Sequence, residues 1–156
     1  MISLHTKGSV IIEVIVVAAI ISLVSLAFLG TLGTLSQFHQ KDMYAIKGGL
    51  LAEEGLEAAR YVKGSGWSTF SAIPINTAQY FALARSSWGV TTTPEFIDGF
   101  FYRSFKLYQV SRNSSDDIVS SGGTVDPNTF LIESNVSWNW RGSTTTSSYK
   151  TYVTNI

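Results

Sequence analysis

An almost unbroken run of apolar residues dominates the start of the chain. Val, Ile, Leu and Ala fill most positions from Ser9 to Leu35, and the residues between Lys7 and Lys41 carry a single charge, that of Glu13. As a helix this run would extend over roughly 40 Å, which exceeds the ~30 Å hydrocarbon core of a bilayer. A buried core helix would need more surrounding chain, and a secretory signal peptide would have a shorter apolar stretch that ends at a small-x-small cleavage site. The pattern therefore predicts a membrane-spanning helix over residues 9–35.

The helical pattern continues beyond this run and becomes one-sided. No proline precedes Pro74, so nothing forces the helix to stop at a membrane surface. In residues 36–63, small or apolar side chains recur every three or four positions and predict one buried face; they are Leu51, Gly55, Ala58 or Ala59, and Val62. The charged side chains lie off that face and predict a solvated surface; they are Glu53, Glu54, Glu57 and Arg60. Lys63 and Gly64 are typical of a helix end, so the expected helix covers about residues 10 to 62.

Residues 64–156 change to a pattern of strands and loops. This part contains 28 serines and threonines, all four tryptophans and little helical periodicity. Phe130 to Trp140 alternates apolar with polar side chains, which is the period of a half-buried strand. Phe100 to Val110 is a further strand, and Tyr149 to Ile156 is a returning strand that forms a hairpin with Phe130 to Trp140.

Turn-forming residues separate these strands. Arg141-Gly142-Ser143 and the threonines after them predict a turn or short loop, and Ser111 to Asn128 predicts a longer loop. Thr77 to Arg85 is ambiguous and could form a short helix. The expected fold class is α+β, in which a long N-terminal helix with a membrane-spanning half and an amphipathic half packs on a small antiparallel sheet. Residues 64–156 form the β-rich head.

Composition excludes several classes of function. The chain has 11 basic and 11 acidic residues and no cysteine, which removes disulfides, thiolate nucleophiles and cysteine-ligated zinc. With only His5 and His39 available, no hydrolytic triad, HExxH pair or phosphate-binding loop can be assembled. We therefore expect no enzyme activity, no cofactor and no metal. Nucleic acid is not an expected partner, because the chain has no lysine or arginine cluster.

Two groups of residues carry weaker signals. Asp116, Asp117 and Asp126 lie in or beside the predicted loop and could contribute to a calcium site, although solvated turn formers are the simpler interpretation. Several aromatic side chains could stack on a ligand or on nucleic acid, and core packing is the simpler interpretation for them; they are Trp88, Phe100, Phe101, Trp138 and Trp140.

The sequence Lys7-Gly8-Ser9-Val10-Ile11-Ile12-Glu13 directly precedes about twenty apolar positions. It resembles the leader junction of the type IV pilin and pseudopilin family, and AEEGLEAARYVKGSGW further on is loosely similar to the helix end of some bacterial prepilins. In that family a membrane peptidase cuts after the glycine of a short basic leader and the new amino terminus is N-methylated. The resemblance implies that residues 1–8 are a leader, that cleavage falls between Gly8 and Ser9, and that Ser9 is N-methylated.

The chain departs from the family pattern at two places. Ser9 stands where phenylalanine is most frequent. Gly30, with Gly33 three residues on, stands where a proline commonly breaks the helix. Glycine weakens a helix by about 0.8–1 kcal/mol relative to alanine, whereas proline costs about 3 kcal/mol. We therefore expect Gly30 and Gly33 to form a softer hinge.

Glu13 is the anomaly of the apolar run. A carboxylate near the bilayer centre costs about 2.5–3.5 kcal/mol, and less toward the interface. One interpretation is that Glu13 lies close enough to the headgroups to stay hydrated. The other is that it pairs with the amine that cleavage would free at Ser9, in the same chain or in a neighbour, which offsets the desolvation of both charges. The resemblance favours pairing during assembly.

The function that the resemblance implies is that of a structural subunit of a pilus or secretion pseudopilus. The implied partners are further copies of the chain, other pilins, the prepilin peptidase and methyltransferase, and an assembly platform driven by an ATPase. The precursor would lie in the bacterial cytoplasmic membrane, and the assembled filament would lie outside it. The alternative is an uncleaved, membrane-anchored extracytoplasmic binding module.

Overall fold

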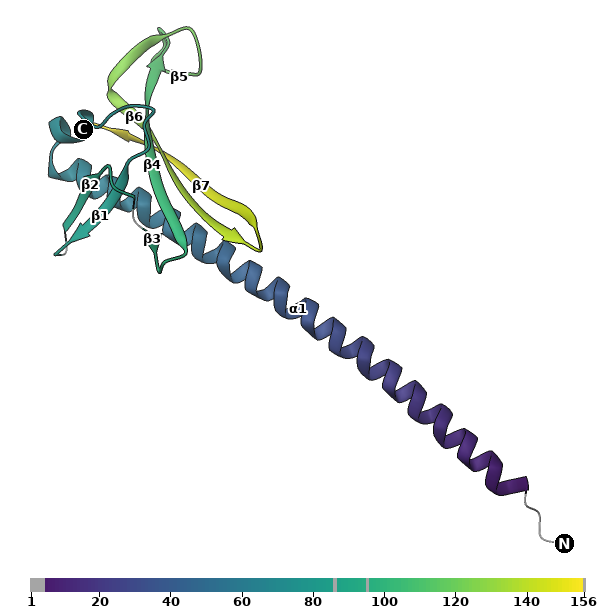
Figure 1. The fold of residues 1–156 in the computed structure, drawn as a ribbon. Coiled ribbons are helices and arrows are strands. Elements are labelled where there is room, and N and C mark those ends of the chain that lie inside the picture. The colour runs from purple at the N-terminus through teal and green to yellow at the C-terminus, as the bar shows by residue number, and fades with distance from the viewer. Residues whose placement is uncertain (1–4, 86, 95, 156) are drawn as a thin grey trace. The chain divides into compact units, whose positions relative to one another are not determined.

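The computed structural model describes residues 5–85, 87–94 and 96–155. The fold is α+β, with a long N-terminal helix packed against a small antiparallel sheet (Figure 1). The chain divides into two compact units, residues 1–43 and 44–156. The elements are α1 (His5–Ser65), α2 (Trp67–Ser71), β1 (Tyr80–Ala84), β2 (Ser87–Thr91), β3 (Phe96–Ile97), β4 (Phe101–Arg112), β5 (Ile118–Val119), β6 (Thr124–Trp140) and β7 (Ser143–Thr154).

Helix α1 ends three residues beyond the expected position, at Ser65. Gly66 follows with a φ of +153°, a backbone conformation that favours glycine, and its N–H donates a hydrogen bond of 3.1 Å to the Lys63 carbonyl. The short helix α2 begins directly afterwards. The glycine-rich end of the helix was therefore predicted correctly from the sequence.

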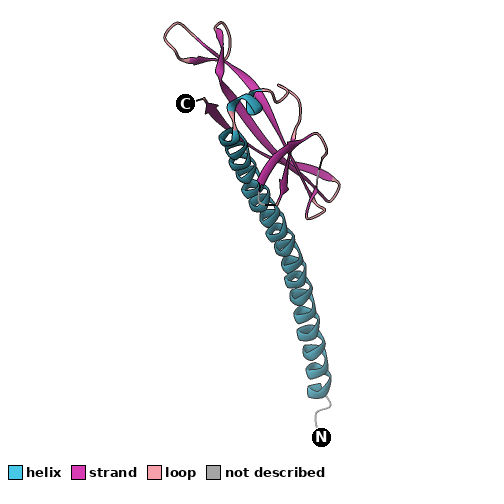
Figure 2. Cartoon of the chain, turned by 90° about the vertical axis from the view of Figure 1, so that its left-hand side faces the viewer, coloured by secondary structure: helices cyan, strands magenta, loops and turns pink. Residues whose placement is uncertain are grey.

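The main sheet has the strand order β3-β4-β6-β7, and β5 pairs with the end of β4. All its pairs are antiparallel. Strands β6 and β7 pair over their shared length without a register shift, whereas β4 and β6 have a bulge between Gln109 and Val110. Residues 75–79 pair with the middle of β4 and lead into a separate two-stranded sheet, formed by β1 and β2. Figure 2 shows these strands gathered along the C-terminal part of α1.

The expected hairpin is confirmed, but its turn is shorter and its second strand longer than predicted. Arg141 and Gly142 form the whole turn, with φ angles of +52° and +83°, as in a type I′ turn. The Asn139 side chain accepts a hydrogen bond of 2.9 Å from the Gly142 N–H. The threonines after Ser143 therefore lie in β7, where β-branched side chains fit well.

Two other segments differ from the expectation. The predicted loop over Ser111 to Asn128 is shorter, because β4 extends to Arg112 and β6 already begins at Thr124, and the short strand β5 interrupts the loop that remains. The possible short helix over Thr77 to Arg85 is instead a bridge to β4 followed by β1. There the Phe81 ring stacks on Phe105 with 4.0 Å between ring centroids, so packing overrides the local preference.

The predicted buried face of α1 is confirmed and lies against the inner face of the sheet. Ala52, Leu56, Ala58, Ala59 and Val62 are buried, and the buried residues of β4 and β6 face them. Small side chains bring the helix close to the strands. The aromatic residues predicted for the core belong to it: Phe101 and Trp138 are buried, and Phe100 and Trp140 pack against their cluster. Trp88 packs against the second cluster, which contains Phe81.

Because residues 44–65 form one wall of this core, the head should need them in order to fold. We expect a fragment beginning at Ser36 to be soluble and to unfold cooperatively in urea, since it keeps every buried residue and loses most of the apolar run. A fragment beginning at Gly64 should show no cooperative transition. Far-ultraviolet circular dichroism would check both, and a cooperative transition of the shorter fragment alone would contradict this role of α1.

Candidate functional site

The N-terminal part of α1 presents apolar side chains on all its sides. From Val10 to Leu35 its large hydrophobic side chains are all exposed, and no part of its most apolar window, with a mean hydropathy of 2.9, is buried within the chain. A helix that is apolar all round is stable in water only when other molecules cover it. Among the described residues, α1 is the one helix long and apolar enough to cross a membrane. This helix could therefore anchor the protein in a membrane.

Hydroxyl groups within the apolar helix are satisfied by its own backbone. Ser22 donates to the Ala18 carbonyl at 2.7 Å, Thr31 to Ala27 at 2.9 Å and Thr34 to Gly30 at 3.1 Å. Each hydroxyl bonds four residues back, which removes the cost of placing it in hydrocarbon. These polar residues are therefore compatible with a lipid or protein environment.

Glu13 is the one charged residue in this apolar surface. Its neighbours in a shallow surface depression are Val14, Val17, Ala18 and Ile21. None of the ion pairs formed by the described residues includes Glu13. Since α1 is helical from His5, Ser9 precedes Glu13 by four residues on the same side, about 6 Å along the axis. Two residues that the sequence singled out thus share one helix face.

The other residues predicted for this site are placed by the backbone of α1. Gly8 and Ser9 are helical, residues 1–4 of the expected leader lie outside the described residues, and the side chains of residues 5–8 are likewise outside the described part. Helix α1 continues through Gly30 and Gly33. A Cβ atom at either glycine would meet nothing within 4 Å, so no contact within the chain requires glycine there. Their role as a hinge stays a prediction.

A buried arginine in the head was missed by the sequence analysis. Arg103 of β4 is 7% exposed; its guanidinium lies 3.1 Å from the Glu54 carboxylate, donates to the Leu51 carbonyl at 3.4 Å and lies over the Trp88 ring. The Glu54 side chain is 47% exposed, as predicted for the solvated face, and it also pairs with this buried cation. The alternation Phe101-Arg103-Phe105-Leu107 was the signal, because it places Arg103 on the inner face of the strand.

Arg103 also lies at the wall of a cavity of about 310 Å³ between α1 and the β1–β2 sheet. Tyr80, Trp88 and Phe96 contribute aromatic surface, and Asp98 contributes a carboxylate that pairs with Lys47 at 2.6 Å. Both acidic groups of the cavity, Glu54 and Asp98, thus have basic partners within the chain. The charges here hold α1 to the sheet.

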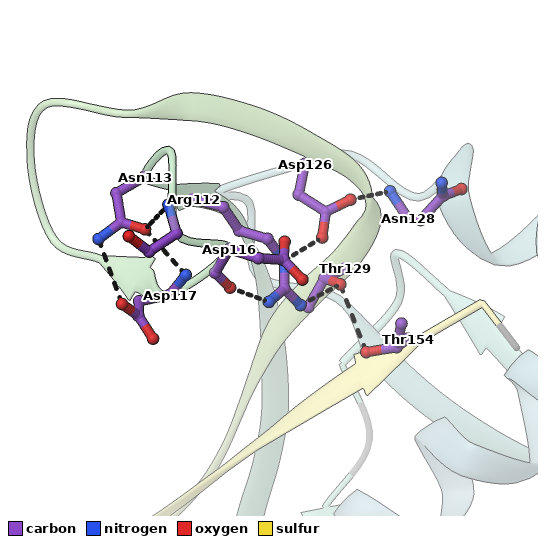
Figure 3. A network of polar contacts seen from close by, with 9 residues as sticks. Arg112, Asn113, Asp116, Asp117, Asp126, Asn128, Thr129 and Thr154 are labelled. Atoms are coloured by element: carbon purple, nitrogen blue, oxygen red, sulfur yellow. Dashed lines mark hydrogen bonds and ion pairs between the residues drawn. The ribbon is translucent and has the colours of Figure 1, made fainter.

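The acidic residues considered for calcium surround Arg112 (Figure 3). Arg112 Nε donates to Asp126 at 2.8 Å and lies 3.6 Å from Asp116, and another guanidinium nitrogen donates to the Asp116 carbonyl at 2.8 Å. The Asp117 carboxylate instead faces the Asn113 side chain. Within residues 5–85, 87–94 and 96–155, no three His, Asp or Glu side chains converge as metal ligands would. The arrangement is that of a turn closed by an arginine.

The contact with Arg112 gives a titration that can be tested. Hydrogen bonds from Arg112, Thr129 and the Asn128 N–H lower the pKa of Asp126 from 3.8 to about 2. Because the pKa is lower in the folded state, the stabilisation is present above about pH 4 and is lost as the pH falls through about 2. We expect Arg112→Met to return the pKa of Asp126 toward 3.8, measured by NMR of the carboxyl carbon.

The matched control is Lys150→Met, at a cation that contacts Glu133 at 3.1 Å and not Asp126. The pKa of Glu133 is lowered first by the Tyr108 hydroxyl and also by Lys150. This variant should therefore shift Glu133 slightly and leave Asp126 unchanged. An unchanged Asp126 titration in Arg112→Met would show that the arginine does not hold that carboxylate.

Comparison of the chain with protein-family models, with curated proteins and with solved structures gave no match.

Proposed function

We propose that this protein is a structural subunit of a type IV pilin-like filament, made as a precursor that is cut between Gly8 and Ser9. The observation that carries the proposal is Glu13, a single carboxylate on an otherwise apolar helix, one turn after Ser9 and without an ion-pair partner in the described chain. The local resemblance of Lys7 to Glu13 to the leader junction of pilins supports the same assignment.

The apolar helix gives this proposal its physical basis. Its uncovered side chains require lipid before assembly, and packing against the same helix of other subunits could replace lipid afterwards. In that setting the amine of Ser9 and the carboxylate of Glu13 would each be costly alone and much less costly as a pair between neighbours. Charge pairing then selects the register in which helices pack, while apolar contact supplies most of the interface.

The proposed partners follow from this sequence of events. A prepilin peptidase would cut the precursor and N-methylate Ser9, and the secondary amine would keep its positive charge, so pairing would survive. An assembly platform with an ATPase would extract subunits from the cytoplasmic membrane into a pilus or pseudopilus. The protein itself would have a structural role and perform no catalysis.

The deciding experiment is imaging of purified surface filaments combined with mass spectrometry of their subunits. We expect filaments whose subunit lacks residues 1–8 and begins at Ser9 with one added methyl group. A full-length, membrane-bound monomer without filaments would instead support the uncleaved binding module.

Cleavage can be tested at the residue that precedes it. We expect Gly8→Val to block processing, because a β-branched side chain would obstruct a peptidase site that accepts glycine. The full-length precursor should then accumulate in the membrane, as judged by the mass of the intact protein. Gly64→Val, at a glycine whose Cβ position is unobstructed, is the matched control and should be processed normally. Efficient removal of residues 1–8 from Gly8→Val would refute this cleavage site.

A further inference from the structure

The two edges of the main sheet differ in whether other segments of the chain pair with them. Three short segments cover the outer edge of β4 along its length: β5 pairs at Ser111 and Arg112, residues 75–79 pair at Phe105 and Leu107, and β3 pairs near Phe101. The opposite edge belongs to β7, whose only strand neighbour among the described residues is β6 (Figures 1 and 2). One edge of this sheet is therefore closed and the other is open.

The exposed edge of β7 lacks most of the features that prevent pairing with another strand. Strand β7 is 12 residues long, has no proline, and pairs with β6 without a bulge. Its single charged residue, Lys150, contacts Glu133 of β6 at 3.1 Å. Long, regular and nearly uncharged edges readily accept an added strand.

The turn before β7 shows which backbone groups are available. Trp140 and Ser143 flank the two-residue turn. In such a turn, the backbone N–H of each flanking residue donates to the backbone carbonyl of the other. Odd-numbered residues of β7 therefore point their N–H and C=O groups toward β6. The even-numbered residues point theirs outward; they are Thr144, Thr146, Ser148, Lys150, Tyr152 and Thr154.

Beside this edge lies a groove whose second wall is α1. It has a volume of about 250 Å³ and is lined by Ile46, Leu50 and Glu53 of α1 and by Ser147 and Tyr149 of β7. Ile46 and Leu50 are 62% and 61% exposed, so two large apolar side chains of α1 stand uncovered next to the outer edge of β7. An apolar helix face alone could accept another helix, but only an extended segment could also pair with the backbone of β7.

We propose that the edge of β7 and this groove form a binding site for an extended segment of another polypeptide, which adds to the sheet as a further antiparallel strand. Apolar side chains of the segment contact Ile46 and Leu50. A basic side chain on the same face of the segment reaches Glu53, which forms no ion pair within the described residues. All residues of the site belong to the compact unit of residues 44–156, so the proposal does not depend on filament assembly.

The probe is a synthetic blocked octapeptide, Val-Thr-Val-Thr-Arg-Thr-Val-Thr, in which arginine takes a valine position. It is added to the ¹⁵N-labelled full chain in detergent micelles, and amide hydrogen exchange is followed by NMR. We expect exchange at the even-numbered residues of β7 to slow by at least about tenfold, while the odd-numbered residues, already paired with β6, stay unchanged. The same peptide with every backbone nitrogen methylated should have no effect, because its backbone cannot donate hydrogen bonds to the carbonyl groups of β7.

Variants separate backbone pairing from the contact with Glu53. Ser148→Pro removes an outward N–H and leaves the pairing with β6, so protection should be lost, whereas Ser148→Thr should behave like the native protein. Glu53→Gln should weaken binding of the peptide that contains arginine. It should leave unchanged the binding of a peptide in which glutamine replaces that arginine. Glu57→Gln, one turn further along α1 at a carboxylate that pairs with Arg60, should change neither.

Two results would overturn the proposal. One is an absence of protection at about 1 mM peptide, which corresponds to a binding free energy weaker than about −4 kcal/mol. The other is protection of the same amides without peptide that increases with protein concentration, since a second copy of the chain would then occupy the edge.

Discussion

Replacement of Glu13 by alanine is expected to abolish filament assembly while leaving membrane insertion and cleavage intact. Insertion should become easier, because the penalty of about 2.5–3.5 kcal/mol or less for the carboxylate disappears. In a packed apolar interface, however, the amine of Ser9 would have no partner, and an uncompensated buried charge costs about 3–5 kcal/mol. The assembly constant should then fall by at least about 100-fold.

The measurement is the ratio of filamentous to membrane-bound mature subunit, with the variant as the only subunit expressed. Glu13→Asp should retain more filaments than Glu13→Gln, because it keeps the charge. Glu57→Ala is the matched control, since it removes a carboxylate of the same helix that is exposed and paired with Arg60. Normal numbers of filaments from Glu13→Ala would mean that Glu13 is merely hydrated near the headgroups and that its charge is incidental to assembly.

The second large effect is expected where α1 touches the sheet. A Cβ atom at Gly48 would lie 2.8 Å from Trp138 Cη2, and one at Gly55 would lie 3.3 Å from Ser134 Cβ with the Ser134 hydroxyl closer still. Both partners are buried and have little room to move. The double variant Gly48→Ala/Gly55→Ala should therefore force the helix away from the strands.

Overpacking costs about 1–3 kcal/mol at each site, from which up to about 1 kcal/mol per site of improved helix propensity is subtracted. The two sites are two helical turns apart and should add approximately, so after subtraction of the full gain in helix propensity we expect the free energy of unfolding to fall by up to about 4 kcal/mol. Urea unfolding of the fragment that begins at Ser36 would measure this. That loss is a large fraction of the total stability of an ordinary domain, about 5–15 kcal/mol.

The neighbouring glycine provides the control. A Cβ atom at Gly49 would lie 3.5 Å from the Tyr149 hydroxyl, which is ordinary contact, so Gly49→Ala should raise stability by up to about 1 kcal/mol. Opposite signs for adjacent glycines would distinguish close packing from helix propensity. Equal effects at Gly48 and Gly49 would show that the approach of α1 to Trp138 is not tight.

Ser134 makes this interface sensitive for a further reason. Its hydroxyl is fully buried, has no hydrogen-bond partner among the residues that the structure describes, and lies opposite Gly55. A buried hydroxyl without a partner costs about 1–3 kcal/mol. Ser134→Ala should therefore be tolerated or stabilising, and it should partly relieve the clash of Gly55→Ala.

Local patterns in the sequence determined the long helix, its apolar and amphipathic halves, the end near Gly64 and the three long strands β4, β6 and β7. These features depend on the periodicity of neighbouring side chains and on the conformational preferences of glycine and proline, which act within a few residues. The junction from Lys7 to Glu13 also stands out in the sequence, because a single charge in an apolar run needs no fold to be noticed.

Tertiary structure decided the features that depend on partners distant in the chain. Residues 80–84 became a strand because Phe81 stacks on Phe105, and Arg103 could enter the core because Glu54 and Trp88 lie across from it. The closeness of Gly48 to Trp138, and the open edge of β7 beside Ile46 and Leu50, likewise exist only once α1 lies on the sheet. Such contacts join residues about 15 to 100 positions apart, and no local periodicity can specify which distant side chain will face another.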